Sequence, residues 1–249
     1  PNDGANPTDF FNTLLYTGDG ATSRSITGVG FRTDFVWIKC RSHTEDHALS
    51  DVVRGADRKL ESNNDTVEET STSSPTAVLS AFGSDGFTGP ASSPGNLNVN
   101  SRTYVAWNWK AGGSAVANND GTIQSSISAN TKAGFSIVGY TGNGVGAATV
   151  GHGLTKTPEL VISKNRDADQ APNYWHVNHV DLTAADYNIF LNLTSAQADV
   201  NANYTDGGIG LGDADVINFI NGTGGANSVA NANKSGSDYI TYCFHSVDG

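Results

Sequence analysis

Residues 10–20 read FFNTLLYTGDG, and residues 135–144 read FSIVGYTGNG. Each stretch is an apolar run that ends in a glycine-rich turn, the pattern of a strand followed by a turn that needs positive φ. A second glycine-centred turn follows in each half, and then an apolar run that ends in lysine, DFVWIKCRS at 34–42 and ELVISKNRD at 159–167. Matching order in both halves indicates two tandem copies of one fold.

Each half also closes with an aromatic stretch, RTYVAWNWK at 102–110 and SDYITYCFH at 237–245. Both alternate with the period of a strand. Trp107 alternates in phase with Val105, and Trp37 lies in a continuous apolar run, so we expect both tryptophans in the core.

One stretch, residues 47–60, has partial helical spacing, but Gly55 interrupts it and its counterpart at 175–193 reads as strand, loop, strand. We therefore expect strands there too. The sequence predicts an all-β protein made of two tandem, homologous β-sandwich domains of jelly-roll or lectin-like type.

The expected domains follow from the repeats and from changes in composition. We expect an N-terminal arm at 1–9, the first sandwich at 10–111, a linker at 112–133 that includes a candidate first strand of the second repeat, and the second sandwich at 134–249. A polar stretch at 63–76 predicts a long surface loop in the first repeat, where recognition often lies.

Composition and charge narrow the function. The formal net charge of the 249 residues is −11, and charged residues make up 16%. An acidic chain is a poor match for a nucleic acid or an anionic membrane surface, so we expect neither partner. No apolar run is long enough to span a membrane or to form the core of a signal peptide. The two cysteines, Cys40 and Cys243, occupy different positions of the repeat, which favours two buried or half-buried thiols.

Metal binding was considered for the loop RSHTEDH at 41–47. His43 and His47 flank Glu45 and Asp46, and such residues can hold a metal ion. The second repeat has no equivalent, and a polar loop with stray histidines explains the pattern, so no metal site is predicted. Calcium is an alternative at the loops NNDGT (118–122), RDAD (166–169) and GDADVIN (212–218), although none has the EF-hand spacing and such loops mostly form Asx-turns.

Enzyme signatures are missing from the sequence: there is no GxSxG, HExxH, P-loop or strand–GxGxxG–helix pattern. Carboxylates that could act in glycoside cleavage are present, and only their separation in space would identify a pair. They are Glu45, Asp46, Asp51, Glu68, Glu69 and Asp85. We therefore predict a protein that is not an enzyme and has no cofactor.

Aromatic side chains are the better candidates for a binding site. Tyr174, Trp175 and His176 follow a polar loop that contains a proline. Exposed aromatic faces stack on sugar rings, and neighbouring amide groups bind hydroxyls. The sequence therefore suggests these three residues as a ligand-binding site, with ordinary core packing as the alternative.

The repeated stretches quoted above, together with HALSDVVRGADRKLESN (47–63) and ATVGHGL (148–154), resemble the tandem-repeat, tail-fibre-like virion proteins of tailed phages, including marine and cyanobacterial phages. The resemblance runs from about residue 9 to the end and rests on strand-and-turn motifs that carry no catalytic residues. It implies a virion surface protein of lectin-like β-sandwiches, made in the cytoplasm of a bacterial host and commonly assembled as a homo-oligomer, with a trimer as the expectation.

Three functions follow from this reading. The first is a non-enzymatic tail or fibre component that contributes to host attachment, with other virion proteins and a host surface glycan as partners. The second is a capsid decoration protein, which needs no ligand. The third is an enzyme that degrades surface polysaccharide, which requires two carboxylates in one groove.

Overall fold

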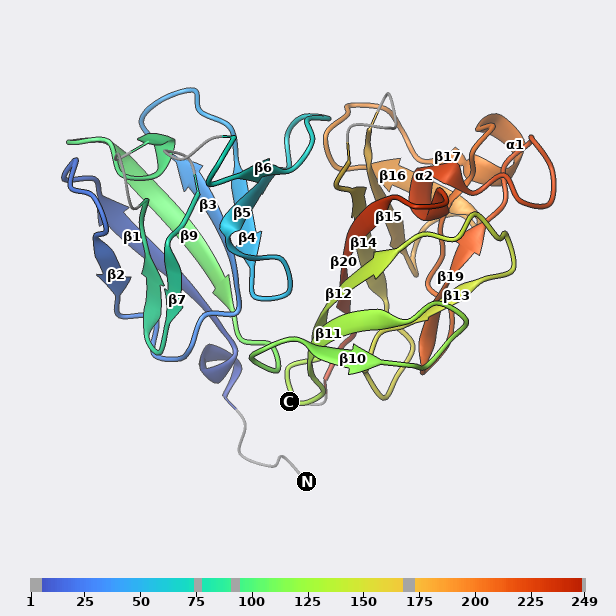
Figure 1. The fold of residues 1–249 in the computed structure, drawn as a ribbon, viewed down its shortest axis with the longest axis horizontal. Coiled ribbons are helices and arrows are strands. Elements are labelled where there is room, and N and C mark those ends of the chain that lie inside the picture. Colours follow the sequence, from blue (N-terminus) through green and yellow to red (C-terminus); the bar gives the residue numbers. More distant parts are fainter. Residues whose placement is uncertain (1–5, 74–77, 91–94, 168–172, 248–249) are drawn as a thin grey trace. The chain divides into compact units, whose positions relative to one another are not determined.

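The computed structural model describes residues 6–73, 78–90, 95–167 and 173–247. The chain is all-β, and its sheets are antiparallel. It divides into two compact units: the first comprises residues up to 63 and 68–114, and the second comprises residues 64–67 and 115–247. Each unit holds one large and one small sheet (Figure 1).

The large sheet of the first unit has the order β1-β9-β3-β4-β5-β6, and its small sheet has the order β2-β8-β7. The elements are η1 (Pro7–Asp9), β1 (Phe11–Thr17), β2 (Ser25–Thr27), β3 (Phe35–Cys40), β4 (Ala48–Asp51), β5 (Gly55–Glu61), β6 (Glu69–Thr70), β7 (Ala81–Gly83), β8 (Gly86–Thr88), η2 (Gly95–Leu97) and β9 (Thr103–Trp109).

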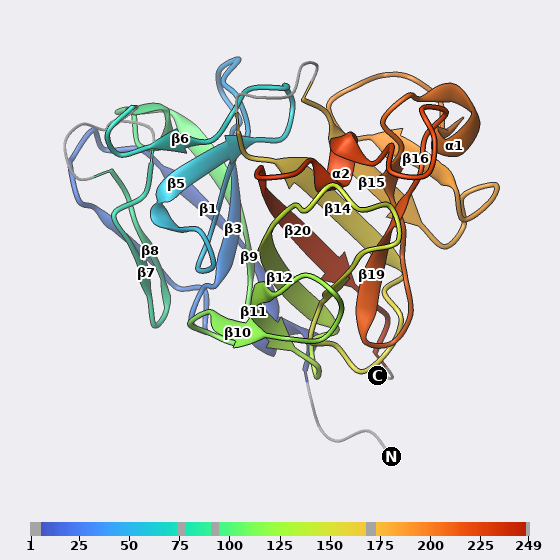
Figure 2. The ribbon, with the colours of Figure 1, turned by 45° about the vertical axis from the view of Figure 1, so that its right-hand side comes forward.

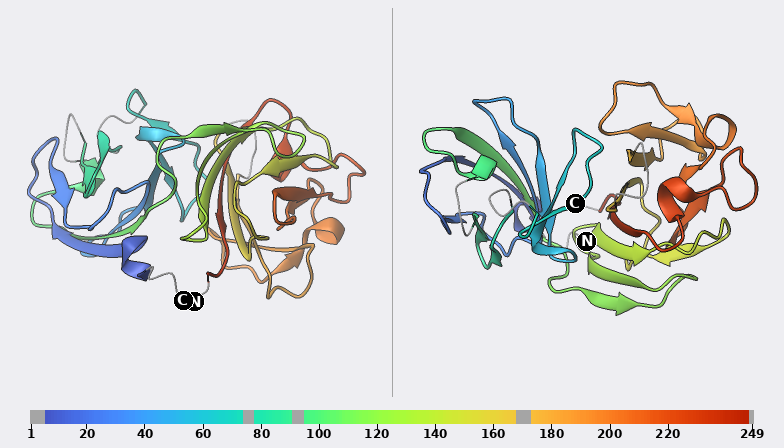
Figure 3. Two further views of the ribbon diagram at one scale, coloured as in Figure 1. Left: turned by 90° about the horizontal axis from the view of Figure 1, so that it is seen from below. Right: turned by 45° about the horizontal axis from the view of Figure 1, so that its top comes forward.

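The small sheet covers one face of the large sheet in this unit (Figure 3). Ile26 of β2 and Phe87 of β8 pack in one buried cluster with Val36 and Ile38 of β3 and Ala106 of β9. Alternation along the strands places these side chains on the covered face. The core of the first unit therefore lies between its two sheets.

A tyrosine pair closes one end of this core. The rings of Tyr16 and Tyr104 stack with centroids 4.9 Å apart. The Tyr16 hydroxyl donates a hydrogen bond to the carbonyl of Leu97 (2.7 Å), and the Tyr104 hydroxyl accepts one from the amide of Val99 (3.0 Å). These bonds fix the loop before β9 against β1.

The turn after β1 is held by the same loop. The Asn98 amide group donates to the Asp19 carboxylate (2.8 Å) and to the carbonyl of Ala21 (2.9 Å). Gly18 lies so close to this loop that a Cβ would overlap the carbonyl oxygen of Val99, and Gly20 has φ +74°. The GDG sequence is thus required by a close approach and by a left-handed backbone position.

The second unit has a large sheet of order β10-β11-β12-β20-β14-β15-β16-β17 and a small sheet of order β13-β19-β18. The elements are β10 (Val116–Asn118), β11 (Ser125–Asn130), β12 (Phe135–Thr141), β13 (Thr149–Gly151), β14 (Leu160–Asn165), β15 (Trp175–His179), β16 (Tyr187–Phe190), β17 (Ala198–Asp199), α1 (Val200–Asn203), β18 (Gly208–Ile209), β19 (Val216–Ile220), α2 (Ala230–Asn233) and β20 (Asp238–Phe244).

The core of this unit also lies between its two sheets, with β19 of the small sheet in front of the large sheet in Figure 2. Ile217 and Phe219 of β19 pack with Val138 of β12, Val161 of β14 and Cys243 of β20. Burial raises the pKa of the Cys243 thiol. Both cysteines are buried and free, which confirms the predicted pair of thiols.

A second tyrosine pair closes this core. Tyr140 and Tyr239 stack with centroids 5.2 Å apart. The Tyr140 hydroxyl donates to the carbonyl of Ala232 (2.7 Å), and the Tyr239 hydroxyl accepts from the amide of Lys234 (2.9 Å). The Asn233 amide group donates to Asn143 Oδ1 (3.0 Å) and thereby holds the turn after β12.

Most expected strands are present. Residues 47–60 contain β4 and all of β5 except its last residue, and 175–193 contain β15 and β16, so the prediction of strands in both stretches is confirmed. Within 112–133, β11 pairs with β12 as expected, and β10 adds a strand where we expected linker. Residues 1–5 of the expected arm and 74–76 of the expected loop lie outside the described residues.

The prediction for two tryptophans was wrong. Trp37 and Trp107 are half-buried and pack edge to face, with ring centroids 6.2 Å apart. Strand alternation puts them on the face of the sheet opposite to Val36 and Ala106, whose side chains form the core. The alternation was predicted correctly, but the small sheet covers the face of the large sheet that carries Val36, Ile38 and Ala106 rather than the face that carries the indoles.

No helix among the described residues is both long and apolar enough to cross a membrane.

Candidate functional site

Three aromatic rings gather in the second unit, and we call them the tyrosine patch: Tyr174, Phe190 and Tyr204. The Phe190 ring lies 5.4 Å from the Tyr174 ring and 5.3 Å from the Tyr204 ring, measured between centroids. Phe190 is buried, whereas both tyrosines are only partly buried. The patch therefore offers two partly accessible phenol rings on a buried aromatic base.

Local hydrogen bonds position these rings. The amide of Trp175 donates to Asn192 Oδ1 (3.0 Å), which ties the start of β15 to the residues after β16. Asp199 caps helix α1 by accepting from the amide of Ala202 (2.8 Å), and Tyr204 follows this helix directly. Each tyrosine thus projects from the end of a regular element, where its backbone is fixed.

The two phenol groups interact electrostatically. Burial, and secondarily the Tyr174 phenol, raises the pKa of Tyr204 above its ordinary value. The Tyr204 hydroxyl therefore stays protonated at neutral pH. A phenol hydroxyl can donate as well as accept hydrogen bonds. Aromatic faces beside such hydroxyls are suited to the apolar faces and hydroxyl groups of a sugar.

Of the three residues that the sequence suggested, only Tyr174 has a partly accessible side chain. Trp175 is 0% exposed and His176 is 2% exposed. The strand β15 is buried on both faces, with Trp175 opposite Lys164 and His176 opposite Ser163 of β14. A ring without an exposed face cannot stack on a sugar from solvent, so neither Trp175 nor His176 can bind a glycan in this way.

His176 packs edge to face on Phe190, with ring centroids 4.9 Å apart. Burial lowers the pKa of His176 to about 4. The ring is therefore neutral at neutral pH and serves as an aromatic layer under the tyrosine patch.

The expected metal candidates have other contacts. His43 Nδ1 lies 3.1 Å from Ser42 Oγ, and Asp46 accepts a hydrogen bond from the Asn63 side chain (2.6 Å). Glu45 pairs with Arg102, and burial lowers the pKa of His47. Across the described residues no group of three or more His, Cys, Asp or Glu side chains is placed to hold a metal ion.

In two of the loops considered as calcium sites, a side-chain oxygen accepts hydrogen bonds from backbone amides of the same loop. Asn118 Oδ1 accepts from the amide of Asp120 (2.6 Å), and Asp213 Oδ1 accepts from the amides of Asp215 (2.9 Å) and Val216 (3.0 Å). Both loops are Asx-turns, as expected for most such loops. Residues 168 and 169 of the third loop lie outside the described residues.

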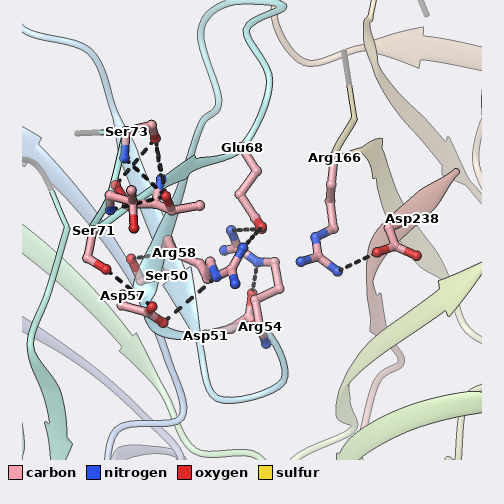
Figure 4. Close-up of polar contacts among 12 residues, drawn as sticks. Ser50, Asp51, Arg54, Asp57, Arg58, Glu68, Ser71, Ser73, Arg166 and Asp238 are labelled. Atoms are coloured by element: carbon pink, nitrogen blue, oxygen red, sulfur yellow. Dashed lines mark hydrogen bonds and ion pairs between the residues drawn. The ribbon is translucent and has the colours of Figure 1, made fainter. Parts of the chain in front are cut away.

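Two of the available carboxylates belong to an ion-pair cluster on β4, β5 and the segment before β6 (Figure 4). Arg54 Nε lies 2.6 Å from Asp51 Oδ2, and both side chains are fully buried. Glu68 lies 3.2 Å from Arg54 Nη1 and 3.2 Å from Arg58 Nη1. The cluster joins the β4–β5 turn to the chain before β6.

The other available carboxylates are also engaged. Asp85 accepts from the amides of Gly28 (3.0 Å) and Gly30 (2.6 Å), and these bonds lower its pKa. Glu69 lies 3.0 Å from Lys59 Nζ. A general acid in glycoside cleavage needs a raised pKa, and the shift at Asp85 has the opposite sign.

Sequence reasoning missed Phe190 and Tyr204 as partners of Tyr174. Phe190 stands in the run NIFLNL, and Tyr204 stands in VNANYTDGG. Thirty residues separate Tyr174 from Tyr204, and nothing in their spacing predicts that both side chains would contact the ring of Phe190. Only the order β15-β16-β17, followed by α1, brings them together.

These observations define an all-β protein of two compact units with an aromatic surface on the second. A family described as a domain of unknown function, DUF7483, matches residues 6–249, and the chain belongs to that family. No curated protein and no solved structure matches the chain.

Proposed function

We propose that the two units are tandem, homologous β-sandwich repeats of jelly-roll or lectin-like type. The order of strands supports this. Taking β1, β9, β3, β4, β5 and β6 of the first unit in turn, their counterparts are β12, β20, β14, β15, β16 and β17, in the same pairing order. The small sheets, β2-β8-β7 and β13-β19-β18, correspond as well.

The two tyrosine pairs support the same proposal at atomic detail. Tyr104 and Tyr239 each accept from the amide five residues earlier. Asn98 holds the turn that follows β1, and Asn233 holds the turn that follows its counterpart β12. Shared side-chain roles at matched positions are difficult to reach by independent routes, so duplication of one ancestral repeat is the simplest account.

We further propose that the protein is a non-enzymatic virion surface component of a tailed phage, on the tail or a fibre, that contributes to host attachment. The matching strand order of the two units is the observation that supports this. Repeats closed by internal hydrogen bonds, without disulfides between the described cysteines, supply a rigid support on which loops bind ligands. The resemblance to tail-fibre-like repeats points the same way, with other virion proteins as partners and a homo-oligomer as the assembly.

Within this proposal the tyrosine patch is the glycan-binding site. Its support is the pair of partly accessible phenol rings on Phe190. A glycan array with the full chain tests it. Binding of a surface glycan should weaken about tenfold or more in Tyr174→Ala and in Tyr204→Ala, because each loses a stacking face.

The matched control is Tyr187→Ala, which removes a half-buried tyrosine at the start of β16. Its glycan binding should match that of the unmodified protein. Equal loss in all three variants would assign the effect to folding, and unchanged binding in Tyr174→Ala and Tyr204→Ala would refute the site.

A further inference from the structure

Strand β1 forms an open edge of the large sheet in the first unit. Among the described residues β9 alone pairs with it, over all seven residues from Phe11 to Thr17. The sequence FNTLLYT has no charge and no proline, and the pairing with β9 has no bulge. Natural edge strands normally carry one of these protections, because an unprotected edge pairs with other strands.

The backbone of this edge is available at its centre. The amide of Lys110 donates to Phe10, and that of Gly18 donates to Arg102, so even-numbered residues exchange hydrogen bonds with β9. Odd-numbered residues therefore point their amides and carbonyls outward. The Thr13 amide donates to Asn12 Oδ1 (2.9 Å), and the Thr17 carbonyl accepts from Arg24 Nη1. The open part of the edge therefore centres on Leu15, and its side chain is 61% exposed.

The second unit shows what covers the corresponding edge there. Strand β12 pairs on its outer side with β11, with Ile127 opposite Val138. The residues just before β11 run beside β13, where Gly121 and Ile123 form bridges with Val150. Ile123 and Ile127 are buried in the core cluster between the two sheets.

The same place in the first unit, between β1 and β2, is a cleft of about 350 Å³. Leu14 and Tyr16 of β1 and Ile26 of β2 line it. The Arg24 guanidinium also lines it, 5.9 Å from the Tyr16 ring and 3.3 Å from Asp19. Thr17, Ser25 and Thr27 add polar groups to this lining. The first unit thus has a cleft of mixed polar and apolar lining beside an open strand edge, where the second unit has its own strand.

We propose that this cleft and edge accept an extended strand from a different polypeptide chain, running antiparallel to β1. The strand is uncharged and carries an aliphatic side chain at the positions that face the cleft, as Ile123 and Ile127 do in the second unit. Main-chain hydrogen bonds to β1 supply affinity and the buried side chains supply selectivity.

A different chain is the source, because no described strand of a second copy has both a free edge and free side chains for this cleft. In β1 of a second copy, Leu14 and Tyr16 already pack against that copy's own core. Its own strand of this pattern, β11, already pairs with β10 on one side and β12 on the other. The partner therefore brings its own strand.

The probe is a synthetic peptide of residues 121–131, GTIQSSISANT, added to the full chain. Amide hydrogen exchange resolved to single residues should show that the amide of Leu15 becomes protected. Two control peptides test the mode of binding: one with Ile127→Asp, which would place a charge in the cleft, and one with alternate amides N-methylated, which removes strand pairing. Both should bind about tenfold or more weakly.

The variant Leu15→Pro removes one outward amide, so the peptide should no longer protect the other amides of β1 from exchange. The methylated peptide also removes a strand hydrogen bond, but it does so without changing the protein. Protection limited to β11 and β12 would mean exchange with the native strand and would overturn the proposal. Two further results would overturn the proposal. The first is a dimer in which the Leu15 amide is already protected before peptide is added, because the occupant would then be a second copy. The second is no change in the exchange of the Leu15 amide at any peptide concentration.

Discussion

Asp51 and Arg54 form an ion pair with no exposed side-chain surface. Removing one member of such a pair leaves an uncompensated buried charge, which costs about 3–5 kcal/mol. Arg54→Met should therefore lower the free energy of unfolding by about this amount, measured by urea denaturation of the full chain.

The matched control is Arg58→Met, since Arg58 pairs with the same Glu68 but has a side chain that is 38% exposed. A pair open to water contributes at most about 1 kcal/mol. Equal losses in the two variants would contradict the assignment of Arg54 as the buried centre of the cluster.

His176 makes stability depend on pH. Its pKa falls from 6.5 to about 4 because the ring is buried. The unfolded chain takes up a proton as pH drops below 6.5, whereas the folded protein does not until about pH 4. The stabilising contribution is thus complete above pH 6.5 and is lost as pH falls toward 4.

We expect the free energy of unfolding to drop by about 2 kcal/mol from this residue between pH 8 and pH 5. In His176→Gln this drop in the free energy of unfolding between pH 8 and pH 5 should disappear. In the control His43→Gln, which changes an exposed residue, the drop should remain. An unchanged pH profile in His176→Gln would show that the ring is already accessible to protons.

At the scale of elements, the turns after β1 and β12 depend on glycine. A Cβ on Gly142 would overlap the carbonyl oxygen of Lys234. Gly142→Ala should therefore cost about 1–3 kcal/mol or more, because backbone rather than a flexible side chain must move. Gly18→Ala should do the same in the first unit.

Gly89→Ala is the control for both, since its Cβ would meet the carbonyl oxygen of Arg24 at 3.5 Å, an ordinary contact. Thermal unfolding distinguishes the three variants. If Gly142→Ala unfolds at the same temperature as Gly89→Ala, the close approach in the turn is not a constraint on the fold.

The sequence predicted the positions of strands better than it predicted which face of each strand is buried in the core. Glycine turns and alternating runs were sufficient for β1, β9, β12 and β20, because these patterns act locally. Strands β4 and β5 were predicted only from their counterpart at 175–193, because their own spacing is partly helical. Strand β10 was missed because VAN between glycine-rich and polar residues lacks an apolar run. Trp37 and Trp107 were assigned to the wrong face, since alternation separates two faces but does not say which one a second sheet will cover.

The candidate site was predictable only in part. Tyr174 was found because it follows a polar loop that contains a proline. Trp175 and His176 were not recognised as buried, since the burial of β15 on both faces depends on distant segments. Phe190 and Tyr204 reach Tyr174 through tertiary structure alone, so no local signal exists for the complete patch.

For the whole molecule, removal of metal ions should have little effect. The oxygens of Asn118 and Asp213 accept backbone amides within their own turns. The melting temperature of the full chain should be the same in EDTA as in millimolar calcium, measured by scanning calorimetry. A rise of several degrees with calcium would show that a calcium site stabilises the fold.

The central proposal is that this all-β protein of two units is a surface component of a phage particle. Cryo-electron microscopy of intact virions, with antibody labelling of this chain, tests it most directly. The account predicts density for paired β units on the tail or its fibres. Labelling spread over the capsid lattice would replace attachment with decoration, and absence of the chain from purified particles would contradict the claim.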